Sequence, residues 1–203
     1  MEVRKSCPLK CSEHCLHYAA DFCYYEQAVK LYSGKVICGS DNGKSGSMVF
    51  LDIDSGKIVH IENYPDAKRM YKLLTDFRPK YAVIEQVFMA AGFKNVASTN
   101  FEIMGRYKQL FELLDIPYDA VRAVSWRKAL NIKAKGRPAQ KAASIVKAQE
   151  LFNKDFDCLC TDYGHIKDHK RVIEREPDDN KCESALIAYY ALQQYKKGLV
   201  NEA

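Results

Sequence analysis

Four acidic residues stand in apolar surroundings where a carboxylate needs a specific partner. Asp41 comes at the end of a short strand-like segment, and Glu85 is flanked by apolar residues within another. Asp179 and Glu183 are four residues apart, which places both side chains on one face of a helix. An acid in such surroundings is costly unless it is paired or bound to a metal ion. The four residues therefore form a candidate acidic cluster.

This cluster has the donor atoms of a magnesium or manganese site. Carboxylate oxygens without His or Cys ligands suit Mg²⁺ or Mn²⁺. Two such ions about 4 Å apart can hold the attacking water and the leaving 3′ oxygen of a phosphodiester, and Asp41 is the candidate to bridge them. A structural alternative stays open for three acids: Asp41 in a turn, Asp179 as a helix N-cap and Glu183 on a solvent-facing helix surface. Glu85 is the hardest to explain in this way.

Basic residues cluster in one twenty-residue stretch before the last acidic pair. We expect Arg127, Lys135, Arg137 and Lys141 to contact phosphates, which give affinity for nucleic acid without reading its sequence. Lys141 is the candidate for the phosphate nearest the metal ions. The formal net charge of +5 is compatible with such a partner. The alternative is a solvated loop and helix face. Trp126, in the same stretch, is expected to be a core residue and is assigned no function.

Residues 1–34 are predicted to form a small Cys-rich N-terminal appendage to a main domain of residues 35–203. Cys7, Cys11, Cys15 and Cys23 could supply four thiolates to a structural Zn²⁺ ion, and His17 is an alternative ligand. A segment with little core would gain from such a metal. Reduced, unligated thiols are the alternative, since without a secretory signal we expect a reducing compartment.

A second set of possible zinc ligands lies in a polar segment before the last helix. Cys158, Cys160, His165 and His169 have a spacing that fits tetrahedral ligation. Here too, unligated thiols in a short loop are the alternative.

The segments that must position these residues alternate in the manner of an α/β protein. Strand-like patterns are followed by helical periodicity, and a turn at 54–56 joins the second and third strands as a hairpin. We therefore expect a mixed five-stranded sheet flanked by helices. The predicted strands are 36–38, 47–53, 57–63, 81–87 and 116–124, the predicted helices are 65–78, 98–114, 139–152 and 179–195, and residues 153–178 are predicted to be irregular.

Composition narrows the class of protein. Of the 203 residues, 47% are hydrophobic and 28% are charged, which excludes a disordered or collagen-like chain. No apolar run approaches the roughly 20 residues that span a bilayer, so no membrane partner is expected. The first residues lack the apolar segment of a secretory signal, and a cytoplasmic protein is predicted.

Four motifs, in order along the chain, resemble the RuvC-type Holliday junction resolvases. The segment IEQVFMA (84–90) is similar to the surroundings of that family's second catalytic acid, and the helix NFEIMGRYKQLFELL follows it. IPYDAVRAVSWRKAL (116–130) is similar to the family's strand that leads into a helix with a V-x-x-x-W start. DDNKCESALIAYYAL (178–192) resembles the last helix of phage and bacterial relatives, and its four-residue spacing of acids is the phage-like one.

The resemblance implies a ribonuclease H-like nuclease domain over residues 35–203. It implies a Mg²⁺-dependent homodimer that cuts symmetric strands of four-way DNA junctions in recombination, repair or phage DNA processing. Carried over by position, its catalytic acids are Asp41, Glu85, Asp179 and Glu183. It also implies that Phe88 stacks on bases, although Phe88 could instead be a core residue.

Two other functions stay open at this stage. One is a ribonuclease H-like nuclease for other branched or hybrid nucleic acids. The other is a non-catalytic, zinc-stabilised DNA-binding module, in which the acids would be dispensable.

Overall fold

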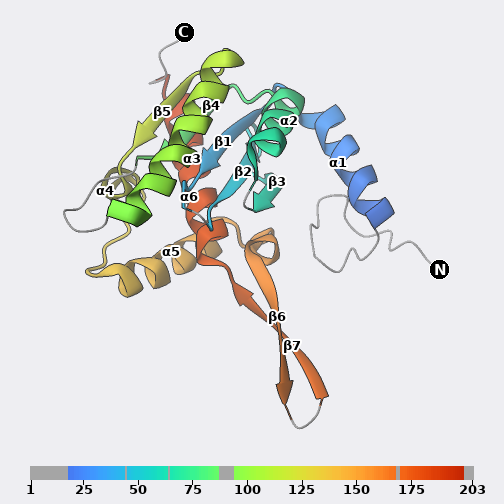
Figure 1. Ribbon diagram of the computed structural model, residues 1–203, viewed down its shortest axis with the longest axis vertical. Coiled ribbons are helices and arrows are strands. Elements are labelled where there is room, and N and C mark those ends of the chain that lie inside the picture. Colours follow the sequence, from blue (N-terminus) through green and yellow to red (C-terminus); the bar gives the residue numbers. More distant parts are fainter. Residues whose placement is uncertain (1–17, 44, 64, 87–93, 168–169, 199–203) are drawn as a thin grey trace.

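A five-stranded sheet forms the centre of the molecule (Figure 1). The computed structural model describes residues 18–43, 45–63, 65–86, 94–167 and 170–198. The strands are β1 (Val36–Ser40), β2 (Ser47–Asp52), β3 (Ile58–Asn63), β4 (Tyr81–Glu85) and β5 (Tyr118–Val121). Their order is β3-β2-β1-β4-β5; β2 pairs antiparallel with β1 and β3, and β4 pairs parallel with β1 and β5. The expected mixed five-stranded sheet is confirmed.

Helices cover both faces of this sheet. The main helices are α1 (Tyr18–Tyr32), α2 (Ala67–Phe77), α3 (Lys94–Leu113), α4 (Ala123–Ala129), α5 (Arg137–Leu151) and α6 (Asp179–Lys196). Buried residues of α1, α2 and α3 share one hydrophobic cluster, whereas those of α4, α5 and α6 share the other. None of the helices in the described ranges is long and apolar enough to cross a membrane.

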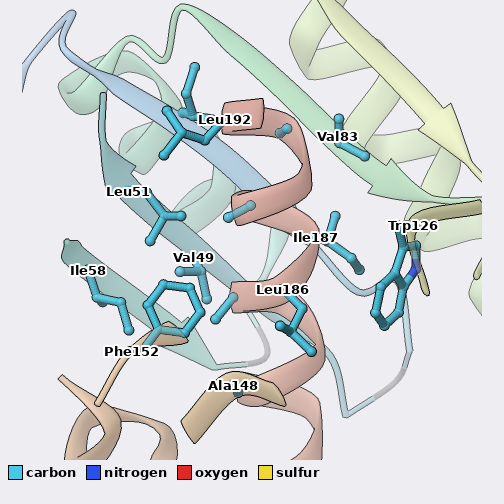
Figure 2. Packing of buried hydrophobic residues seen from close by; sticks show 14 of the residues in the cluster. Val49, Leu51, Ile58, Val83, Trp126, Ala148, Phe152, Leu186, Ile187 and Leu192 are labelled. Atoms are coloured by element: carbon cyan, nitrogen blue, oxygen red, sulfur yellow. The ribbon is translucent and has the colours of Figure 1, made fainter. Parts of the chain in front are cut away.

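Alternate residues of the central strands supply the two clusters. In β1, Val36 and Cys38 join the cluster of α2 and α3, while Ile37 joins the cluster of α6. Successive strand side chains point to opposite faces, so a strand covered on both sides must be apolar along its whole length. Figure 2 shows the α6 side of this core, where Leu186 and Ile187 gather with Val49 and Trp126.

Helix α1 lies within the predicted N-terminal appendage, and its second half packs on the main domain. Ala28 is buried in the α2 and α3 cluster, and the Tyr25 hydroxyl donates to Asp76 Oδ2 at 2.6 Å. Cys7, Cys11, Cys15 and His17 lie outside the described residues, as does the side chain of Cys23. The zinc site and the two-part organisation remain predictions.

The segment predicted to be irregular instead forms a short 3₁₀ helix (Phe156–Leu159) and a β-hairpin. Strand β6 (Cys160–Lys167) pairs antiparallel with β7 (Lys170–Pro177), and the hairpin projects from the body of the molecule (Figure 1). Polar and charged residues occupy both strands, so the alternation of apolar and polar residues that marks a half-buried strand is absent. The prediction of irregular structure was wrong for this reason.

The hairpin also separates the second set of possible zinc ligands. Cys160 begins β6 and His165 lies five residues further along the same strand, a backbone separation of roughly 17 Å. Two residues so far apart cannot share one metal ion, so the predicted four-ligand site is wrong. Cys158 and Cys160 are instead buried at the root of the hairpin, and His169 lies outside the described residues.

The fifth strand is shorter than predicted. It ends at Val121, and the extended residue Arg122 begins helix α4, which includes Val124 and Trp126. The apolar run through Val124 resembles a strand, but its last residues form the first turn of this helix.

Helix α6 crosses the sheet in very close contact with β1. A methyl group on Gly39 would overlap the backbone of Ala188 and lie 2.7 Å from its Cβ atom. Gly39 therefore lets helix and sheet approach more closely than any other residue would allow. This contact fixes how far the first turns of α6 lie from the end of β1.

Gly39→Ala is expected to destabilise the protein by about 3 kcal/mol, the upper end of the usual cost of overpacking, because the obstacle is backbone. Chemical denaturation measures this free energy of unfolding. Gly105→Ala is the matched control, since a Cβ there has no neighbour within 4 Å and alanine favours a helix. Equal stability of Gly39→Ala and the wild type would contradict the close contact.

Candidate active site

The sheet brings the first two acids together. Asp41 directly follows β1, and Glu85 is the last residue of β4. The two strands are parallel neighbours, with Ser40 opposite Ile84, so Asp41 and Glu85 occupy adjacent positions at the same edge. The short turn after Asp41 returns the chain to β2, and the Gly43 N–H donates to Asp41 Oδ1 at 3.2 Å. Topology alone thus pairs two residues 44 positions apart.

Helix α6 brings the other two acids to this edge. Its N-cap is Asp178, whose carboxylate accepts from the backbone N–H groups of Asn180 and Lys181. Asp179 and Glu183 follow on the first two turns. The structural alternative of Asp179 as the N-cap is therefore excluded. Glu183 is buried, so its alternative as a solvent-facing residue is excluded as well.

A cavity of about 690 Å³ lies at the edge of the sheet where β1 and β4 end, and three of the acids line it. Asp41, Glu85 and Glu183 line it, whereas Asp179 does not and is held beside it by Lys141. Basic side chains supply much of the remaining wall. They are Arg122, Arg127, Arg137 and Lys141.

Burial and mutual repulsion govern the ionisation of the two strand acids. Burial, followed by the charge of Glu183, raises the pKa of Asp41 to about 6, against the lowering effects of the Gly43 N–H and of Lys141. Burial, followed by the charge of Asp41, raises the pKa of Glu85 to about 7, although the hydrogen bond from Trp126 lowers it. The two carboxylates therefore form a site where negative charge is costly and a cation is favoured.

Cationic side chains neutralise the two helix acids. Arg127 donates to Glu183 Oε1 at 2.6 Å, and Ser144, which is fully buried, donates to the same oxygen at 3.2 Å. Lys141 forms an ion pair with Asp179. Two of the basic residues predicted to bind phosphate thus contact the acids directly.

The other residues predicted to contact DNA differ in their position relative to the cavity. Arg137 is exposed at the cavity wall, whereas Lys135 is exposed and does not line the cavity. Phe88 lies outside the described residues, and base stacking remains a prediction.

Three residues that contact the acids were not identified from the sequence. Trp126 is buried as expected, but its indole N–H also donates to Glu85 Oε2 at 2.9 Å. Ser144 holds Glu183, and Ser184 accepts from the Asp41 N–H at 3.1 Å. Only Trp126 carried a usable signal, because a buried indole N–H requires an acceptor. The two serines are ordinary helix residues whose contacts come from distant elements.

Two buried polar atoms in the cavity wall lack protein partners among the described residues. They are Asn42 Oδ1 and Arg127 Nε, one acceptor and one donor. The Asn42 amide nitrogen donates to the backbone carbonyl of Glu85, which fixes its oxygen as the unpaired end. Unpaired buried polar groups cost free energy unless a ligand or water completes them.

The donor set fits a hard divalent cation. All candidate ligands are carboxylates, which match Mg²⁺ and Mn²⁺. Within the described ranges, no three Cys, His, Asp or Glu side chains converge closely enough to hold an ion as they stand. Arg127 and Lys141 pair with Glu183 and Asp179 instead.

Solved structures share this fold. Thermus thermophilus RuvC in complex with a Holliday junction substrate matches with a TM-score of 0.57 and 13% identity over 81% of this chain and 98% of RuvC. A second structure of the same RuvC matches with a TM-score of 0.57, 15% identity and the same coverage. The expected ribonuclease H-like, RuvC-type fold is therefore confirmed. No protein-family model matches the chain, and no curated protein does.

The raised pKa of Asp41 predicts how this site affects stability. In the unfolded chain an aspartate ionises near its ordinary pKa of 3.8, so from there to about 6 the folded protein binds more protons. The free energy of unfolding therefore falls as the pH rises through this window.

Asp41→Asn is expected to stabilise the EDTA-treated protein by about 1–3 kcal/mol at pH 8 and by much less at pH 4, because it removes a buried charge. Denaturation at both pH values measures the effect. Asp54→Asn, at an exposed turn, serves as the control. A variant that is less stable than the wild type at pH 8 would contradict the electrostatic description of the site.

Proposed function

We propose that this protein is a metal-dependent endonuclease that resolves four-way DNA junctions. The main support is the meeting of Asp41, Glu85 and Glu183 in one cavity with a basic wall. The fold adds support, since it is shared with a RuvC that was solved with a Holliday junction substrate. The sequence motifs that resemble the RuvC-type resolvases fall on the same elements. Recombination or phage DNA processing is the proposed setting.

The proposed metal ligands are Asp41, Glu85, Asp179 and Glu183. Two Mg²⁺ or Mn²⁺ ions bound there would activate the attacking water and offset charge on the leaving 3′ oxygen of the phosphodiester. Asp41 directly follows β1, the strand that pairs with β4 and packs against α6. It is therefore the acid that we propose to serve both ions.

The basic residues have a second role in this proposal. Arg127 and Lys141 form ion pairs with Glu183 and Asp179. Once cations bind these carboxylates, the two basic side chains can bind phosphoryl oxygens instead. Arg122 and Arg137, further out in the wall, are placed to hold the flanking phosphates of the DNA strand. Lys135, although outside the cavity, is proposed to follow the DNA backbone beyond it.

Symmetric cutting of a junction needs two active sites, so we propose a twofold homodimer. The four N-terminal cysteines, Cys7, Cys11, Cys15 and Cys23, are proposed to bind a structural Zn²⁺ ion. Neither feature is needed for the chemistry at a single site.

A cleavage assay tests the proposed function. Purified protein with excess Mg²⁺ is mixed with an end-labelled mobile four-way junction and, in parallel, with a linear duplex of the same arms. Paired symmetric nicks in the junction alone are expected. Equal cutting of both substrates would replace the proposal with a general nuclease. Binding without cutting, in Mg²⁺ and Mn²⁺ alike, would replace it with a DNA-binding module.

Asp41→Asn is expected to reduce the rate of junction cleavage by about a thousandfold or more, because a shared metal ligand stabilises the transition state by several kcal/mol. Junction binding, measured by gel shift, should persist. Asp54→Asn should cleave at the wild-type rate. A variant of Asp41 that still cuts in Mg²⁺ would place the active site elsewhere.

Arg137→Ala is expected to weaken junction binding and to reduce the slope of log K against log salt concentration by about 1, the effect of one lost phosphate contact. Binding is measured in the Asp41→Asn background, where the substrate stays intact. Lys147→Ala is the matched control, since Lys147 lies on the same helix but pairs with Glu150 outside the cavity. Equal slopes for the two variants would remove Arg137 from the DNA path.

A further inference from the structure

Trp126 is the point where the hydrophobic core meets the acidic cluster. Its ring is fully buried in the cluster of α6, together with Leu186 and Ile187 (Figure 2). Trp126 itself does not line the cavity, but its indole N–H donates at 2.9 Å to Oε2 of Glu85, which does. Indole has one donor and no acceptor, so this single bond is the whole of its polar chemistry. The rigid core therefore holds one oxygen of the strand acid.

This bond makes the two oxygens of Glu85 unequal. Oε2 accepts the indole N–H, whereas Oε1 receives no hydrogen bond from the described residues. A carboxylate held at one oxygen by a donor that cannot rotate has its other oxygen oriented as well. In metal sites, such outer hydrogen bonds set the direction of the ligand and are needed for full affinity.

Arg127, the residue after Trp126, connects the indole ring to Glu183. The guanidinium carbon of Arg127 lies 4.7 Å from the centroid of the Trp126 ring, within the range of a cation–π contact. Arg127 in turn donates to Glu183 Oε1 at 2.6 Å. Two consecutive residues of α4 thus contact carboxylates from β4 and from α6. β4 and α6 also pack against each other directly, so α4 adds a polar link between the acids of two elements that the core already holds together.

We propose that Trp126 is a positioning residue of the cation site, which orients Glu85 through its N–H and supports the Arg127–Glu183 pair through its ring. This role rests on the proposed function, because it assigns Glu85 and Glu183 to cation binding. A role in packing alone would make the N–H bond incidental, and loss of the bond would then affect stability without affecting affinity for the cation.

Trp126→Phe separates the two roles, since it keeps an aromatic ring and removes the donor. The dissociation constant for Mn²⁺, measured by calorimetry without DNA, is expected to rise about 10- to 100-fold. Phe152→Leu is the matched control: Phe152 is buried in the same hydrophobic cluster, but its ring carries no hydrogen-bond donor for an acid of the site. It should change the Mn²⁺ affinity by less than about twofold, because the site is not in contact with it.

The outcomes separate this role from the proposed function. Wild-type affinity in Trp126→Phe would overturn the positioning role and leave the metal-dependent nuclease intact. Failure of the wild type itself to bind Mn²⁺ would overturn the proposed metal dependence and the positioning role together. Junction cleavage by the wild type is measured on the same preparation, so that the result for the proposed nuclease is known independently of the result for Trp126.

A second measurement uses the unmodified side chain, in case Trp126→Phe does not fold. Trp126 is the only tryptophan of the chain, so its fluorescence reports on this hydrogen bond directly. Mg²⁺ is expected to change the emission with the same midpoint as its binding isotherm, and Glu85→Ala should abolish that change. Mg²⁺ binding that leaves the emission of the wild type unaltered would overturn the proposal.

Discussion

Repulsion among buried carboxylates is the constraint on which the rest of the site depends. Asp41, Glu85 and Glu183 come from three elements and share one cavity, where burial and neighbouring negative charge raise the pKa of Asp41 and of Glu85. Such an arrangement persists only if the surrounding structure holds it, because each acid alone would turn towards water. The offsetting contacts are those of Arg127, Lys141 and Trp126.

The fold supplies this support through close packing rather than through many polar contacts. Gly39 allows α6 to lie against β1, and the strands beside it are covered on both faces. The acids therefore sit at the ends of rigid elements, where a small displacement of the helix would separate Glu183 from Asp41. Backbone and core thus provide a precision that flexible loops could not provide.

Local patterns in the sequence were sufficient to predict much of the fold and part of the candidate site. Apolar strands and a four-residue helical spacing predicted the sheet and the elements that carry the four acids, because those signals depend on near neighbours. They did not show that Asp179 lies beside the cavity and not in its wall. The pairing of Arg127 with Glu183 depends on residues 56 positions apart, and no local pattern encodes it. The hairpin of β6 and β7 was missed because both of its strands are polar. Trp126 was recognised as a core residue, but its bond to Glu85 required the three-dimensional arrangement of α4 and β4.

In the proposed site, Arg127 and Lys141 hold the acidic ligands until the cation binds. A crystal structure of the protein with Mn²⁺, using the anomalous signal of the metal, would show whether they do. The expected result is manganese bound to Asp41 and Glu85, with Lys141 moved away from Asp179. Unchanged ion pairs at saturating Mn²⁺, with no anomalous peak among the four carboxylates, would contradict it.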